Sequence, residues 1–517
     1  MKDKDQRRYF FAFLGGKLLA VGLVLATIKF VTGPFLHSVA GAQDASAPPV
    51  EDVVNATNTA WTLVTAFLVF FMQAGFMMLE AGFARTREVV NVLQECIVDT
   101  CLCALLFWAF GFAFMFGAGN GWIRHQFFFL NNAPATYGST GVALMAFFLF
   151  QFAFADTWST ITSGAMVGRT GFKGDLLSSI GVSGFIYPIV GHWVWGPDGW
   201  LATQSVPFRD FAGSTVVHTI GGTIALVGAI ALGPRIGRMF KRDGGGMPPA
   251  HDLTLASLGG VILWFGWYGF NPGSTLSALD AGGIGRIATN TTLAAAAGGL
   301  AAMFFLYPRV RKWDMGITIN GFLGGLVAIT CPCYWVNQLG AVIIGMVAGV
   351  VVVLAVDLLE WLRFDDPIGA WPVHGACGIW GTLSLGLFAT GQYFLPGPTG
   401  ADTSSPITGL FYGGGGSQLW AQVVGSVSVT VSVVVLAAIL MYGVKLTRTL
   451  RVSEAGELEG IDIHEHGTPS YHPEFEFMSI SLPGLTAPGS GPVPVDHYVP
   501  LDGHSAGAIS AAITDPT

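Results

Sequence analysis

Long apolar segments recur along the chain, separated by short polar loops. At 1.5 Å rise per residue, about 20 apolar residues cross the hydrocarbon core of a bilayer as an α-helix. The pattern therefore predicts an all-α polytopic membrane protein with eleven transmembrane helices. We expect them near residues 60–82, 92–117, 141–167, 175–198, 214–233, 255–273, 286–306, 317–336, 338–356, 367–388 and 418–443.

The first 42 residues have the pattern of a secretory signal peptide. Four basic residues within the first eight precede an apolar stretch, and Ala40–Ala42 supplies a small-residue cleavage site. The alternative is an uncleaved first helix. Residues 43–59 are polar and contain proline, which is typical of a short extracytoplasmic lead.

Basic residues are distributed unevenly between alternate loops. If the mature N-terminus lies outside, the loops and chain end on the cytoplasmic side carry fifteen Lys and Arg residues. The opposite loops carry only Arg124, Arg209 and Arg286. Because cytoplasmic loops are enriched in basic residues, this bias predicts a multi-pass cell (inner) membrane protein with an outside N-terminus and a cytoplasmic C-terminus.

Two Val-His pairs divide the predicted helices into halves. His218 lies in the fifth helix and His374 in the tenth. This placement favours two inverted five-helix repeats plus one extra helix. The halves are residues 60–233 and 255–388, joined by a cytoplasmic loop at 234–254. An extracytoplasmic loop at 389–417, the eleventh helix at 418–443 and a cytoplasmic tail at 444–517 follow.

Composition excludes several classes of function. Hydrophobic residues make up 52% of the chain, charged residues only 11%, and the mean hydropathy is +0.58. A soluble domain carries about 25% charged residues. The net charge of −8 offers no basic patch for nucleic acid. The six cysteines fall within predicted helices, without zinc-site spacing, and the histidines lack a nucleophile or a third metal ligand. We therefore expect no enzyme, cofactor or metal site.

Polar and aromatic groups at bilayer depth are the candidate functional residues. A lone histidine there is most often a packing residue, but two at matched positions favour a pair. If the His218 and His374 rings meet, one imidazole donates to the other, and the pair lines a polar strip or relays a proton.

A second group of candidates lies at the outer ends of the helices. Trp195 has the position of an aromatic-belt anchor, yet its indole face and the Ser274 hydroxyl are also suited to a small cation. Asp210 precedes His218 by eight residues and has two compatible interpretations. It is an N-cap for the following helix, or it adds a negative field at the pore mouth.

These motifs together resemble the ammonium transporter (Amt/Mep/Rh) family over roughly residues 60–471. The residues that carry the resemblance are Phe71–Arg85 (FMQAGFMMLEAGFAR), Asp210–His218 (DFAGSTVVH), Gly266–Ser274 (GWYGFNPGS), Asp365–Gly381 (DDPIGAWPVHGACGIWG) and Leu450–Tyr471. Their order, with eleven helices and an outside N-terminus, makes the match specific.

The resemblance implies a homotrimer with a pore in each subunit. Trp195, Ser274 and Phe154 match the outer ammonium site, and Asp210 matches the acid that supports it. Phe154 and Phe270 match the stacked rings of the gate. The remaining pore positions are His218, His374, Gln151 and Trp267.

The resemblance also implies partners and a mechanism. The cargo is ammonium, or its analogue methylammonium, and the tail is the expected site for a PII-type regulator. We expect capture of ammonium, deprotonation near the gate and passage of ammonia past the histidines. The alternatives are an ammonium sensor that signals through its tail, or a channel for a neutral gas, against which the cation site argues.

Two positions depart from what is expected. Gly369 stands where many members of the family carry an acid, so helix-end packing or gate coupling is expected to differ. Asp156 is an unusual acid within a predicted helix. It should point away from Phe154 and form an interhelical hydrogen bond.

Overall fold

The computed structural model describes residues 48–394 and 404–471. The predicted signal peptide and residues 472–517 of the predicted tail lie outside these ranges.

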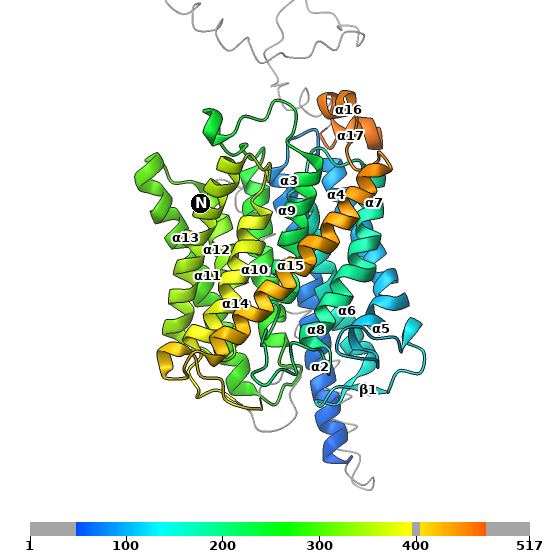
Figure 1. Cartoon of the computed structure of the whole chain (residues 1–517), viewed down its shortest axis with the longest axis vertical. Helices are drawn as coiled ribbons and strands as arrows, with labels where there is room; N and C mark the ends of the chain where they lie inside the picture. Colours follow the sequence, from blue (N-terminus) through cyan, green and yellow to red (C-terminus); the bar gives the residue numbers. More distant parts are fainter. Residues whose placement is uncertain (1–47, 395–403, 472–517) are drawn as a thin grey trace, which may run out of the picture.

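The described chain is a bundle of long helices whose axes are roughly parallel to one another (Figure 1). The helices are α2 (Val50–Phe70), α3 (Met72–Phe83), α4 (Val89–Leu106), α5 (Phe112–Phe116), α6 (Leu144–Gly164), α7 (Phe172–Gly181), α8 (Tyr187–Trp195), α9 (Ile220–Leu232), α10 (Leu253–Gly273), α11 (Ala281–Val310), α12 (Met315–Thr330), α13 (Gln338–Leu362), α14 (Cys377–Phe388), α15 (Ser417–Leu446), α16 (Glu454–Glu459) and α17 (Ile461–His466). The strands β1 (Thr136–Tyr137) and β2 (Val142–Ala143) form a small antiparallel hairpin.

Several spans contain π-helical or 3₁₀ turns. The π-helical segments are η1 (Phe107–Gly111), η3 (Val182–Ile186), η4 (Ser214–Thr219) and η6 (Trp371–Ala376). The 3₁₀ turns are η2 (Phe128–Leu130), η5 (Lys241–Asp243) and η7 (Leu410–Tyr412). π-helical turns are frequent at functional sites. The segments η4 and η6, which contain His218 and His374, therefore mark the region where we look for the site.

Each of the eleven predicted segments coincides with helix. Among the described residues, nine helical segments are long and apolar enough to cross a membrane. The other two predicted spans correspond to the shorter apolar helix α12 and to η6 with α14. The multi-pass membrane architecture follows from these segments, whereas the count of eleven crossings stays a prediction.

The first helix begins earlier than expected. Pro49 precedes Val50, the first residue of α2, ten residues before the predicted start. Proline suits a helix start, and Glu51 and Asp52 in the first turn favour the helix dipole. The charges of this polar segment therefore stabilise a helix start, and its extracytoplasmic location stays a prediction.

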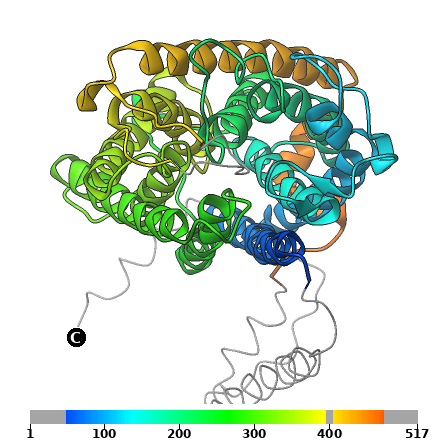
Figure 2. The same ribbon diagram turned by 90° about the horizontal axis from the view of Figure 1, so that it is seen from below.

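The long helix α15 joins the two halves of the bundle. It runs along one side of the molecule (Figure 2) and packs against α9 of the first half and α14 of the second. Near its end α16 and α17 fold back, at the opposite end of the bundle from the β1–β2 hairpin (Figure 1). We call these two ends the tail face and the hairpin face.

The tail helices bind residues of the first half. The Asn91 amide of α4 donates to Asp462 Oδ1 at 2.9 Å, and Asn91 Oδ1 lies 2.9 Å from His466 Nε2. Arg87 donates to the Leu458 carbonyl, and Arg451 of the tail donates to the Leu232 carbonyl of α9 at 2.9 Å. These contacts hold α16 and α17 against the membrane domain.

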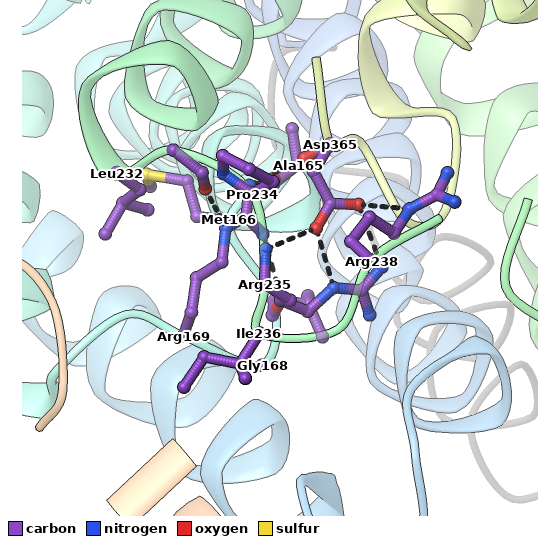
Figure 3. A network of polar contacts seen from close by, with 12 residues as sticks. Ala165, Met166, Gly168, Arg169, Leu232, Pro234, Arg235, Ile236, Arg238 and Asp365 are labelled. Atoms are coloured by element: carbon purple, nitrogen blue, oxygen red, sulfur yellow. Dashed lines mark hydrogen bonds and ion pairs between the residues drawn. The ribbon is translucent and has the colours of Figure 1, made fainter. Parts of the chain in front are cut away.

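A buried ion-pair network fixes the loops of the tail face (Figure 3). Arg235 Nε and Nη2 donate to the two oxygens of Asp365, each at 2.9 Å, and Arg238 Nε adds a bond at 3.1 Å. Arg169 Nη2 donates to the Asp365 carbonyl at 2.6 Å. Because such pairs are stable only with complete hydrogen bonding, the network holds the loop before η6 in one geometry.

Candidate functional site

A large cavity opens toward the hairpin face. It leaves about 490 Å³ for the centre of a water-sized molecule. All of the residues predicted for the outer site line it, and Phe150 lies among them. The predicted residues are Phe154, Gln151, Trp195, Asp210 and Ser274.

Phenylalanine rings close the floor of this outer cavity. The Phe154 and Phe270 rings are stacked, with centroids 4.0 Å apart and planes inclined by 24°. Phe150 packs on Phe154 at 4.7 Å, and Trp195 meets it edge-on at 5.9 Å. At 4.0 Å two rings are in van der Waals contact, so no solute passes between them without ring movement.

The two histidines meet directly below Phe270. His218 Nδ1 lies 3.1 Å from His374 Nδ1, and the ring planes are inclined by 26°. His218 also stacks on Phe270 at 5.5 Å and on Trp267 at 5.2 Å. A contact between two Nδ1 atoms requires one donor and one acceptor, so the arrangement fits two neutral rings or a pair sharing one proton.

The outer nitrogen of His218 is buried and has no hydrogen-bond partner among the described residues. Trp267, which flanks the same ring, is fixed by a 2.9 Å bond from its indole nitrogen to Thr330. The histidine nitrogen is therefore open to a solute or water inside the pore, while its aromatic neighbours are held in place.

Asp210 shapes the helix that carries His218. Its two carboxylate oxygens accept hydrogen bonds at 2.8–3.0 Å from four consecutive backbone amides, 213 to 216. Its carbonyl accepts the Trp195 indole N–H at 2.8 Å. The capping interpretation therefore describes its contacts, and Asp210 acts on the outer cavity by orienting Trp195 and the start of η4.

The second half repeats this device, a correspondence that sequence reasoning missed. Asp366 precedes His374 by eight residues, as Asp210 precedes His218. The Asp366 carboxylate accepts the amides of residues 369, 370 and 371 at 2.8–3.0 Å. The equal spacing was visible in the sequence and supports the predicted internal repeat.

The same comparison explains Gly369. Its φ of +81° matches the left-handed φ of +116° at Gly213, the third residue after the other capping acid. Glycine adopts this conformation without a steric penalty. Glycine at position 369 therefore suits the backbone, and the Asp366 cap is present around it.

Gln151 and Ser274 present oxygen atoms to the outer cavity. Gln151 Oε1 is buried without a hydrogen-bond partner among residues that the structure describes. The Ser274 hydroxyl donates to the Phe270 carbonyl at 2.8 Å, which leaves its oxygen lone pairs available. Two acceptors beside an indole form a suitable environment for a small hydrogen-bonding cation.

A much smaller cavity lies on the other side of the histidines, toward the tail face. It leaves about 20 Å³ for the centre of a water-sized molecule and is lined by His374, Phe76, Glu80 and Gly369 among others. Phe270 and His218 line neither cavity. The two cavities are thus separated by the Phe270 and His218 rings, and the pore is closed in this conformation.

The interhelical hydrogen bond expected of Asp156 stays a prediction. Asp156 is completely buried on α6, and neither carboxyl oxygen has a partner with hydrogen-bond geometry in the described part of the chain. Thr100 and Gln73 are its polar neighbours.

No set of three His, Cys, Asp or Glu residues is arranged to hold a metal ion within residues 48–394 and 404–471. The five buried cysteines and the exposed Cys101 are all unbridged.

Comparison with known proteins points to one family. The family model of the Ammonium Transporter Family matches residues 60–471. A putative ammonium transporter from Synechocystis sp. is 42% identical over 464 residues, covering 87% of this chain and 98% of the relative. Ammonium transporter Amt2 of Archaeoglobus fulgidus is also 42% identical, over 444 residues, with coverage of 83% and 91%.

Similar solved structures indicate the same family. A structure titled "Sensor Amt Protein" has a TM-score of 0.72 and 35% identity, covering 80% of this chain and all of that chain. Mep2 of Saccharomyces cerevisiae has a TM-score of 0.69 and 29% identity, covering 77% and 90%. With a family match over most of the chain, two closely similar full-length relatives and the same helical architecture, the chain belongs to the ammonium transporter family.

Proposed function

We propose that this protein transports ammonium across the cell membrane, with the hairpin face outside and the tail face in the cytoplasm. Ammonium is captured in the outer cavity and loses a proton, and ammonia then passes the phenylalanine gate and the two histidines. The observation that carries the proposal is the unbroken stack of Phe154, Phe270, His218 and His374 between the two cavities.

Capture in the outer cavity relies on Trp195, Gln151 and Ser274. Attraction of a cation to an indole face contributes about 0.5–2 kcal/mol, and the Gln151 and Ser274 oxygens accept N–H donors from ammonium. Binding of this strength is modest, so the cation is concentrated at the gate and is still released readily.

The closed aromatic floor favours neutral ammonia over ammonium. Moving an unpaired ion into an apolar site costs several kcal/mol or more, whereas ammonia avoids most of that cost. When the proton of His218 lies on Nδ1, its free Nε2 accepts a hydrogen bond from ammonia or water beyond the gate, and in the other tautomer it donates one. Potassium has no proton to lose, so the same floor excludes it.

The test is current measurement on a solid-supported membrane carrying proteoliposomes. Pulses of ammonium and methylammonium are expected to give saturable currents in the wild type, potassium pulses no current, and His218→Ala a much smaller ammonium current. Equal potassium and ammonium currents, or an unchanged current in His218→Ala, would contradict the mechanism.

Sensing is a second candidate function. The similar structure titled as a sensor and the docked helices α16 and α17, which couple the tail to α4, favour it. Ammonium binding that changes the protection of the tail amides, with neither current nor ammonia flux, would support sensing over transport.

Assembly and regulation follow from family membership as further proposals. We expect a homotrimer, testable by the mass of the purified protein, and a PII-type regulator at the tail face, testable by co-purification. Truncation after Leu446 should abolish binding of that regulator.

A further inference from the structure

Glu80 lies at an unusual place for a carboxyl group. It belongs to α3, inside a helix expected to cross the membrane, and only 2% of its surface is exposed. Glu80 lies in the last turn of α3, and an acid buried there is costly unless it has a function or a partner, because the protein interior does not solvate charge. The proposed mechanism does not use it.

Glu80 shares the small inner cavity with His374. A water molecule needs about 10–15 Å³ of such space, so the 20 Å³ available fits about one water or ammonia molecule. A molecule that leaves the histidines toward the tail face therefore enters a compartment whose titratable lining groups are an imidazole and a carboxyl group.

Contacts between α3 and α6 fix the carboxyl group. Ser163 Oγ donates a long hydrogen bond of 3.5 Å to Glu80 Oε2. Seven residues earlier, on the same face of α3, Gln73 Oε1 accepts a 2.8 Å bond from Thr160. These two contacts hold α3 against α6, so the position of Glu80 beside the cavity is set by helix packing.

We propose that Glu80 is the proton-carrying residue at the inner end of the pore. This inference rests on the proposed transport function. A proton removed from ammonium at the gate passes along His218 and His374. It reaches the Glu80 carboxylate through the molecule in the inner cavity, breaking an N–H bond at His374 and forming an O–H bond at Glu80.

The same residue then returns the proton to the cargo. Ammonia in the inner cavity uses its lone pair to take the Glu80 proton, so the O–H bond breaks, an N–H bond forms and the carboxylate is restored. Ammonium leaves toward the cytoplasm, and each transported nitrogen carries its charge across. Without an acid at position 80, ammonia passes but its proton does not.

The test compares charge moved with ammonia moved in the same proteoliposomes. Solid-supported membrane currents report charge, and uptake of radiolabelled methylammonium reports the flux of cargo whether or not its proton crosses with it, which we call the ammonia flux. Glu80→Gln keeps size and polarity but cannot carry a proton. We expect its current to fall roughly tenfold or more while its ammonia flux stays near the wild-type value.

Glu95→Gln is the matched control. Glu95 lies on the neighbouring helix α4, is also 2% exposed and is hydrogen-bonded to Asn91 at 2.9 Å, but it does not line the inner cavity. Its ratio of charge to flux should equal that of the wild type. Glu80→Asp, which keeps a carboxyl group, should restore part of the current. Thermal unfolding of each variant reports whether it is folded.

The outcomes separate the two proposals. An unchanged charge-to-flux ratio in folded Glu80→Gln overturns the role of Glu80, and so does an equal loss in Glu95→Gln. A wild type that moves ammonia without current also overturns it but leaves the transport proposal standing. A wild type with neither signal overturns the transport proposal itself.

Discussion

The two ends of the pore share one arrangement, an aspartate that caps the helix carrying a pore histidine, but the space around the two caps differs. At the hairpin end Asp210 caps the helix of His218, and at the tail end Asp366 caps the helix of His374. Each acid lies eight residues before its histidine. The hairpin end opens into a cavity of about 490 Å³, whereas the tail end leaves about 20 Å³.

The neighbours of the two acids differ as well. The carbonyl of Asp210 binds Trp195, a residue that lines the open outer cavity. Asp366 follows Asp365, which is buried in ion pairs with Arg235 and Arg238. The comparison teaches that the same helix cap places a histidine at the centre of the pore from both ends, although one end is open and the other is nearly closed.

The largest expected effect is on the ion pairs of the tail end. Asp365→Asn breaks a fully buried pair and should lower the free energy of unfolding by about 3–5 kcal/mol. The matched change at the hairpin end is Asp198→Asn, since Asp198 pairs with Arg124 but is 50% exposed, and it should cost up to about 1 kcal/mol. Thermal unfolding in detergent measures both, and equal losses would show that the two ends are fixed equally.

The same pair makes a prediction about pH. Burial raises the pKa of Asp365, but hydrogen bonds from Arg235 and the charges of Arg169 and Arg235 outweigh burial and hold its pKa well below the usual value. A depressed folded-state pKa contributes stability above the ordinary value of about 4, which is lost as pH falls through the lower folded pKa. Asp365→Asn should therefore flatten the acid limb of the stability profile.

The next effect concerns the two caps. Asp210→Ala leaves four backbone amides without their acceptor and Asp366→Ala leaves three, so we expect losses of about 2–4 kcal/mol, larger for Asp210. Asp252→Ala, which removes a more exposed cap of α10, is the control and should cost about 0.5–2 kcal/mol. Thermal unfolding measures these losses. A loss of stability at only one of the two buried caps would contradict the view that both ends use the same arrangement.

Smaller effects should distinguish the two left-handed glycines. A β-carbon at Gly213 would lie 2.7 Å from Val217, at a φ of +116°, whereas at Gly369 it would meet only the tip of the Asn320 side chain. Gly213→Ala should therefore cost about 2–3 kcal/mol and Gly369→Ala about 1 kcal/mol. Gly369→Asp should be tolerated at least as well as alanine, since aspartate accepts left-handed backbone. A greater loss at Gly369 in unfolding experiments would reverse this order.

The smallest effect concerns the docked tail helix. Burial lowers the pKa of His466, although the charges of Asp462 and Glu465 oppose the shift. A lowered folded-state pKa stabilises docking above about pH 6.5, and that contribution is lost as pH falls toward the folded value. His466→Ala should cost about 1 kcal/mol and remove this pH dependence, as read from hydrogen exchange of the α17 amides. Exchange that is insensitive to pH in the wild type would exclude His466 as the cause.

Sequence alone indicated the membrane architecture and the family. It also predicted Trp195, Phe154, Phe270 and the two histidines as residues of the site. Hydropathy and the order of motifs are local properties of the chain, so they can be read without knowledge of the three-dimensional structure. Only the tertiary structure decided that the rings close the pore, that Gly369 is a backbone requirement and that Glu80 reaches the His374 cavity. Those facts depend on how helices distant in sequence approach one another, and side-chain packing across helices is not encoded in any single segment.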